Sequence, residues 1–154
     1  MLRTVLFGGA VVLLGACGDD AGAVETPLIV GPYGGNLQLE PDTYTRLPPS
    51  LDAISPGQTA RFYWYHPGAA GRTITFEVRA ETTALAHGTV IHTEAHVVPG
   101  GSTHGMVAFE PRRLSQGGAR RGERGQLEWL DGIYSVKGRL DGGEHFATGI
   151  FEVR

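Results

Sequence analysis

The feature that most constrains this chain is an apolar–polar alternation with a period of two, which recurs in short runs between residues 59 and 153. Within residues 73–80, for example, Ile74, Phe76 and Val78 alternate with polar or charged side chains. This is the pattern of a half-buried β-strand. No window shows the 3.6-residue apolar stripe of an amphipathic helix. The alternation therefore predicts strands that each turn one face toward a core.

Turn-forming residues divide these runs into separate strands. Strands are predicted at residues 28–30, 36–40, 59–66, 73–80, 89–98, 104–109, 126–130, 133–140 and 144–153. Asp141-Gly142-Gly143 lies between the last two as a hairpin turn, because Asp and Gly tolerate positive φ. Turns also explain the 24 glycines among 154 residues. Strands at this spacing predict an all-β, antiparallel sandwich or barrel.

The first 17 residues have the form of an export signal. Arg3 precedes an uncharged apolar run, Val5 to Ala16, which is shorter than the roughly 20 residues of a membrane-spanning helix. The run ends in Leu14-Gly15-Ala16-Cys17, which resembles the lipobox of bacterial lipoproteins. The resemblance implies cleavage after residue 16, a diacylglyceryl group on the sulfur of Cys17, and an acyl chain such as palmitate on its amino group. An ordinary secretory signal with a chance cysteine is the alternative.

The rest of the chain divides into a tether and one domain. Residues 17–27 are small, acidic and poor in apolar side chains, which is typical of a flexible spacer, and residues 28–154 carry the strand pattern. Cys17 is the only cysteine, so it has no intramolecular disulfide partner. Gly18 follows it where Asp would favour inner-membrane retention in enterobacterial lipoproteins. The resemblance therefore implies a bacterial envelope protein, in the outer membrane rather than the inner.

Two local sequences favour one kind of all-β fold over the others. Leu130-Asp131-Gly132-Ile133-Tyr134 resembles the tyrosine corner of immunoglobulin-like sandwiches, in which the Tyr134 hydroxyl would bond to backbone just upstream. Ser55-Pro56-Gly57-Gln58-Thr59 resembles the entry to strand B of bacterial immunoglobulin-like domains. The resemblance implies a sandwich of about seven to eight strands, without the cysteine pair of antibody domains. A jelly roll or a small barrel is the alternative.

His92-x-Glu94-x-His96 is the sharpest polar pattern in the chain. The alternation predicts Ile91, Thr93, Ala95 and Val97 on the inward face of this strand and the three polar residues on the outward face. Histidine and glutamate are suitable ligands for zinc or a similar divalent metal. Since His92 and His96 would lie about 13 Å apart along a strand, we do not expect all three to meet at one ion. Two of them could bind an ion if a neighbouring strand or loop supplied further ligands. His87, His104 and His145 are candidates, and a solvated strand face is the alternative.

Arg112, Arg113, Arg120, Arg121 and Arg124 lie in one connection that carries a single Glu, Glu123. Such a connection is suited to bind anionic groups such as lipid headgroups or acidic polysaccharide. The alternative is a solvated, structureless loop whose charge is balanced elsewhere. A second candidate is the aromatic run at residues 62–65, whose outward Tyr63 and Tyr65 could stack against a sugar. Core and edge packing is the alternative for these aromatic residues.

The remaining signals are negative. The formal charge of −3 differs from the strongly basic balance of nucleic-acid binders. The sequence holds no nucleophile-elbow motif and no phosphate-binding glycine motif. We therefore expect a non-catalytic, membrane-anchored lipoprotein without a cofactor, whose domain binds an envelope protein or a glycan or has a structural role. The alternative is a metal-binding lipoprotein that uses the strand histidines.

Overall fold

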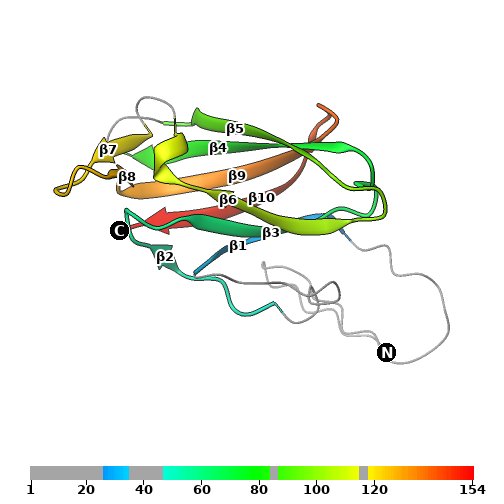
Figure 1. Cartoon of the computed structure of the whole chain (residues 1–154), viewed down its shortest axis with the longest axis horizontal. Coiled ribbons are helices and arrows are strands. Elements are labelled where there is room, and N and C mark those ends of the chain that lie inside the picture. Colours follow the sequence, from blue (N-terminus) through cyan, green and yellow to red (C-terminus); the bar gives the residue numbers. More distant parts are fainter. Residues whose placement is uncertain (1–25, 35–46, 84–86, 115–117) are drawn as a thin grey trace, which may run out of the picture.

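Two β-sheets form the body of the molecule (Figure 1). The computed structural model describes residues 26–34, 47–83, 87–114 and 118–154. One sheet has the strand order β1 (Leu28–Tyr33), β3 (Ala60–Tyr65), β6 (His104–Phe109). The other has the order β2 (Ala53–Ile54), β10 (His145–Val153), β9 (Gly132–Leu140), β4 (Thr73–Thr83), β5 (Thr89–Val97). Neighbouring strands run antiparallel, apart from the short parallel pair of β2 and β10. The fold class is thus all-β, as the alternation predicted.

The bounds of the elements follow the predicted strands closely. They are β1 Leu28–Tyr33, β2 Ala53–Ile54, β3 Ala60–Tyr65, β4 Thr73–Thr83, β5 Thr89–Val97, β6 His104–Phe109, the 3-10 turn η2 Pro111–Arg113, β7 Ala119–Arg121, β8 Leu127–Trp129, β9 Gly132–Leu140 and β10 His145–Val153. The sequence did not predict β2 and β7, which are two and three residues long. The strand predicted at residues 36–40 lies outside the described residues, as do the signal sequence and Cys17.

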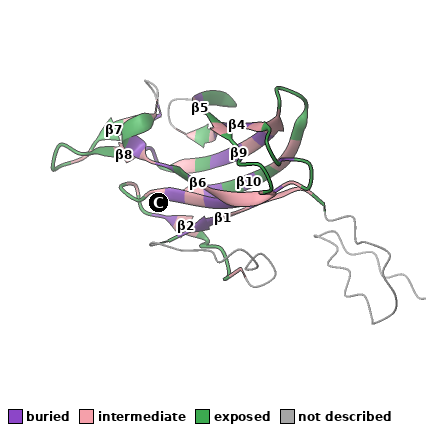
Figure 2. Cartoon of the chain, turned by 45° about the vertical axis from the view of Figure 1, so that its right-hand side comes forward, coloured by how far each residue is buried: buried purple, intermediate pink, exposed green. Residues whose placement is uncertain are grey.

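The facing sides of the two sheets make one hydrophobic core (Figure 2). Alternate residues of β4 are buried, because the strand turns one face inward and the other to solvent. Aromatic rings join the two sheets: Phe62 of β3 packs edge-on against Phe151 of β10, with ring centroids 5.5 Å apart. The ring centroids of Trp64 in β3 and Phe76 in β4 are 6.4 Å apart. Ala60, Phe62 and Trp64, which alternate with Tyr63 and Tyr65 along β3, therefore face this core.

On the outer face of β3 the aromatic residues are packed rather than presented to solvent. Tyr63 and Tyr65 are 0% and 7% exposed, and with Tyr33 of β1 they form a second, smaller hydrophobic cluster. Leu47 and Met106 pack against this cluster. Both faces of the three-stranded sheet are thus covered, which is why all four aromatic residues of the strand are buried. A solvent-facing tyrosine platform for sugar is wrong, because neither ring is accessible.

The crossover into β9 is fixed by one hydrogen bond. The hydroxyl of Tyr134 donates to the carbonyl oxygen of Leu130 at 2.6 Å, in a fully buried position. The tyrosine ring stacks on Phe151 with centroids 5.1 Å apart. Gly132, which lies between Leu130 and Tyr134 in the sequence, has φ +147°. A Cβ at this position would lie 2.1 Å from the Thr82 carbonyl oxygen, so there is no room for one. A glycine is therefore required where the chain turns into the sheet.

The hairpin between β9 and β10 has the turn that its sequence predicts. Asp141 and Gly142 both have positive φ, at 47° and 72°. Such a pair matches the right-handed twist of the flanking strands. The Asp141 carboxylate also accepts hydrogen bonds from the Thr73 backbone N–H and from the Arg72 guanidinium. None of the described residues forms a helix of the length and apolar character that a membrane crossing needs.

Candidate functional site

The strand that carries the predicted metal ligands, β5, contains a β-bulge. Val78 of β4 lies opposite His92, whereas the next residue, Arg79, lies opposite Val90. Ile91 is therefore an extra residue in the ladder, and it is buried at 2% exposure. A bulge places two residues against one on the neighbouring strand, so the alternation after it is shifted.

The shift turns the polar residues of β5 toward the core side of the sheet. The opposed pairs are His92 with Val78, Glu94 with Phe76 and His96 with Ile74. Directly opposed residues of an antiparallel pair share a face, and these β4 partners belong to the core. Thr93, Ala95 and Val97 face solvent instead, with Val97 73% exposed. The predicted orientation of this strand was therefore wrong for every residue after Ile91.

His92, Glu94 and His96 line the open edge of the sandwich, where they meet core aromatic rings. The His92 ring lies edge-on to Phe109 of β6 at 5.9 Å between centroids. The His96 ring lies edge-on to Trp64 of β3 at 5.8 Å. These residues are half-buried rather than solvated. The imidazoles thus cover the hydrophobic core at the edge where the two sheets separate.

The structure brings together two of the three residues. Nε2 of His92 and Oε2 of Glu94 are 3.3 Å apart. The guanidinium of Arg113, from the 3-10 turn η2, approaches the same carboxylate oxygen at 4.0 Å. The sequence did not connect Arg113 with Glu94, because the two are neither adjacent nor on the same strand. A cation next to the carboxylate competes with a metal ion for its charge.

The other histidines lie elsewhere. His87 is in an exposed turn, His104 packs against Tyr63 on the outer face of the three-stranded sheet, and His145 lies on the outer face of the five-stranded sheet. Within the described part of the chain, no three His, Cys, Asp or Glu side chains gather in a way that would hold a metal ion. His92 and Glu94 alone supply two donors, which leaves the remaining coordination positions of a tetrahedral zinc ion without protein ligands.

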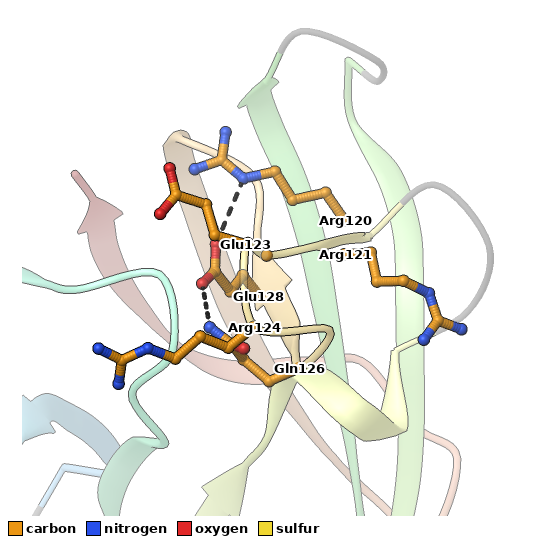
Figure 3. Close-up of a pocket in the computed structure, with 7 residues that line it drawn as sticks. Arg120, Arg121, Glu123, Arg124, Gln126 and Glu128 are labelled. Atoms are coloured by element: carbon orange, nitrogen blue, oxygen red, sulfur yellow. Dashed lines mark hydrogen bonds and ion pairs between the residues drawn. The ribbon is translucent and has the colours of Figure 1, made fainter.

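The arginine-rich connection is structured rather than a plain loop. Arg112 and Arg113 belong to η2, and Arg120 and Arg121 to the β7–β8 hairpin. This hairpin lines a surface concavity of about 520 Å³. Figure 3 shows its lining side chains, most of which are charged. The charged and amide residues that line it are Arg120, Arg121, Glu123, Arg124, Gln126 and Glu128.

Neighbouring carboxylates offset most of the arginine charge. Arg120 lies 3.6 Å from both Glu128 and Asp131, and Arg112 pairs with Glu110. Arg113 lies 3.8 Å from the same glutamate. The acid partners precede or follow the arginine-rich segment in sequence, so a count within the segment overstates its charge.

The arginines do not converge on one point. Arg121 donates to the Gly125 carbonyl oxygen, and Arg124 extends from the opposite side of the hairpin (Figure 3). Glu128 occupies the space beneath Arg120, where it also accepts a hydrogen bond from Gln126 at 2.8 Å. The concavity therefore offers both charge signs to a ligand rather than a uniform anion-binding surface.

A further charged cluster, which the sequence did not single out, lies on the outer face of the five-stranded sheet. The Glu77 carboxylate is within 3.1 Å of Arg79, 3.2 Å of Arg139 and 3.4 Å of His145. Burial raises the pKa of Glu77, but the hydrogen bond from Arg79 and the charges of Arg139 and His145 outweigh it and hold the pKa below its usual value. The sheet register, which no sequence pattern reports, creates this cluster.

Comparisons with known proteins give little further information. No family model and no curated protein matches the chain. Among solved structures, it is similar to Pseudomonas fluorescens alkylpurine DNA glycosylase AlkC bound to DNA containing an abasic site analog, with 14% identity and a TM-score of 0.39. That similarity covers 67% of this chain and 27% of the other. A likeness of this degree supports no conclusion about function.

Proposed function

We propose that this chain is a lipid-anchored bacterial envelope protein whose β-sandwich is a non-catalytic binding or structural module. The observation that carries the proposal is Leu14-Gly15-Ala16-Cys17 at the end of an uncharged apolar run. One acyl chain gives marginal membrane binding, whereas several give stable anchoring. Cys17 is the only thiol in the chain, so lipidation leaves no free cysteine. An outer-membrane location follows from the same resemblance.

The strand order supports an immunoglobulin-like sandwich. In that fold strands A, B and E share one sheet, and strands C, F and G share the other. Here β1, β3 and β6 form one sheet, and β4, β9 and β10 are consecutive neighbours in the other. The hydrogen bond from Tyr134 to Leu130 has the geometry of a tyrosine corner. Domains of this architecture present sheet faces and loops to partners, which is why a protein or glycan partner is proposed.

Lipidation is tested by labelling the full chain with a fatty-acid analogue in a bacterial host. We expect the wild type to incorporate the label and to sediment with membranes. Cys17→Ser should abolish both properties, and Gly18→Ala, a matched neighbouring change, should retain them. Equal labelling of wild type and Cys17→Ser, or none in either, contradicts the proposal. Crosslinking in the intact envelope then identifies the partner.

Metal binding is the second candidate, and it depends on the 3.3 Å approach of His92 to Glu94. Two donors on one strand, completed by water or by a ligand from a partner, suffice for weak binding of a divalent ion. Isothermal titration with zinc tests this function. We expect heat at micromolar zinc that His92→Ala removes and that His87→Ala, at an exposed turn, retains. No heat from the wild type, or equal heat from both variants, excludes this candidate.

A further inference from the structure

The five-stranded sheet ends in a long strand with an open side. Among the described strands β5 pairs with β4 alone, and it is the last strand of its sheet. The open side of an edge strand presents backbone N–H and C=O groups that can pair with another chain. Its solvent-facing side chains after the bulge, Thr93, Ala95 and Val97, are exposed. This edge therefore has both the backbone groups and the side chains of an interaction surface.

Two features limit how another strand can pair there. The bulge at Ile91 interrupts the regular ladder at one end, and Pro99, which has no N–H, ends it at the other. The regular part of the ladder thus runs from His92 to Val97, and Ala95 lies within it. Any partner strand must also place its core-side residues opposite those of β5, because a one-residue slip would expose them.

A second copy of the chain meets these conditions in one register. With the two strands antiparallel about Ala95, Glu94 lies opposite the partner's His96, and the partner's Glu94 lies opposite His96. On the outer face Thr93 lies opposite the partner's Val97, which covers an exposed apolar side chain. An imidazole opposite a carboxylate can donate a hydrogen bond to it, and a pair of β-branched side chains packs well across two strands.

Two registers on the N-terminal side of Ala95 are less favourable. Pairing about Glu94 would place two carboxylates directly opposite each other, and like charges in that position are destabilising. Pairing about Thr93 would extend through the bulge at Ile91, where the ladder is irregular. A second copy supplies a complementary residue for both Glu94 and His96, because the two-fold axis places each opposite the other. The inward polar residues thus select this chain as its own partner.

We propose that two copies of this protein associate through antiparallel pairing of β5 about Ala95, which joins their five-stranded sheets into one. The pairing is independent of the membrane anchor, because the residues that make it are all in the sandwich. Tests on the unlipidated Cys17→Ser chain therefore leave the proposed lipidation unaffected, and failure of one proposal does not affect the other.

The first experiment places a cysteine on the two-fold axis. Opposed residues in an antiparallel pair have Cα atoms about 4.5–5.5 Å apart, which is within the range of a disulfide. Added to the Cys17→Ser chain, Ala95→Cys should give a disulfide-linked dimer under mild oxidation. Thr148→Cys, on the exposed face of β10 in the same sheet, should stay monomeric. Absence of the Ala95→Cys dimer, or equal crosslinking of both variants, overturns the proposal.

The second experiment tests the register by charge complementation. His96→Glu alone should weaken dimerisation at least about tenfold in sedimentation equilibrium, because carboxylates then face each other. Mixing the His96→Glu chain with a Glu94→His chain restores both carboxylate–imidazole pairs, so a heterodimer should form. Thermal melting of each variant reports whether it folds, and a misfolded variant leaves the disulfide result decisive. A folded His96→Glu chain that dimerises like the wild type overturns the proposed register.

Discussion

Replacing Tyr134 with Phe removes one buried hydroxyl and leaves the ring in place. The ring stacks on Phe151 and meets Trp129 edge-on at 5.2 Å, and phenylalanine preserves both contacts. The substitution removes the hydroxyl and its 2.6 Å hydrogen bond to the carbonyl oxygen of Leu130. Leu130 is itself only 8% exposed. The substitution therefore isolates the hydrogen bond from the packing around it.

The expected loss of stability follows from the burial of both partners. A hydrogen bond contributes about 0.5–1.5 kcal/mol net, and leaving a buried acceptor unsatisfied costs about 1–3 kcal/mol. We expect Tyr134→Phe to lower the free energy of unfolding by about 1–3 kcal/mol. For a domain of this size that corresponds to a melting temperature lower by roughly 3–12 °C. Because the ring stays in place, the surface exposed on unfolding is nearly the same. We therefore expect no change in the slope of the unfolding free energy against urea concentration.

Urea denaturation followed by tryptophan fluorescence measures this loss, since Trp64 and Trp129 are both buried. Tyr33→Phe is the matched control. Tyr33 is 2% exposed, and its buried hydroxyl has no hydrogen-bond partner among the residues that the structure describes. Its removal should leave stability unchanged or increase it, because an unsatisfied buried polar group is lost. Equal destabilisation by both substitutions, or none by Tyr134→Phe, would refute the reasoning.

The same residue predicts the response to alkaline pH. Burial raises the pKa of Tyr134 to about 12, whereas an exposed tyrosine titrates near 10. Below about pH 10 the hydroxyl is protonated in both states, so its contribution to stability is complete. As the pH rises from about 10 toward about 12 the unfolded chain loses its proton first, and the free energy of unfolding falls. Tyr134→Phe should show a smaller fall over this interval.

Two further substitutions test close packing and a turn carboxylate. Gly105→Ala brings a Cβ within 2.9 Å of the Trp64 ring, so we expect about 1–3 kcal/mol of destabilisation in urea. Gly57→Ala, with open space around it, should have little effect, and equal effects contradict the packing argument. The hydrogen bond from the Thr73 N–H is the largest cause that lowers the pKa of Asp141. The carboxylate therefore contributes to folding stability at pH values above the usual Asp pKa, and this contribution is lost as the pH falls through the lowered pKa. Asp141→Asn, which tolerates the positive φ, should be less stable at neutral pH and lose less on acidification; an unchanged acid response contradicts this.

The sequence predicted the strands well because each depends on local alternation between turn residues. His104–Phe109 is predicted with the observed bounds, and the hairpin at residues 141–143 follows from its Asp-Gly pair. The prediction missed β2, since two residues are too few to show a period and their pairing partner is far along the chain. It missed β7 because the arginines of that strand resemble a solvated loop.

The candidate site was predicted less well, for two physical reasons. A bulge is set by the fit of one strand to its neighbour, so nothing within residues 89–98 indicated that Ile91 would shift the alternation. The ion pairs of Glu77 and of Arg113 depend on strand register and on the path of a connection. The sequence identified the polar residues of β5 correctly, but their direction, their contacts and their place at an open edge all required the tertiary structure.

The parallel pair of β2 and β10 has a consequence for when the sandwich is complete during synthesis. Ile54 lies opposite Val153, and the Arg154 N–H donates to the Ile54 carbonyl oxygen at 3.1 Å. The chain that precedes β3 is thus held by the last strand of the sandwich to leave the ribosome. Contacts between residues so far apart are slow to form, because a long loop must close before they stabilise anything. A nascent chain without β10 leaves β2 and one side of β9 unpaired, so the domain stays open until its final strand is available.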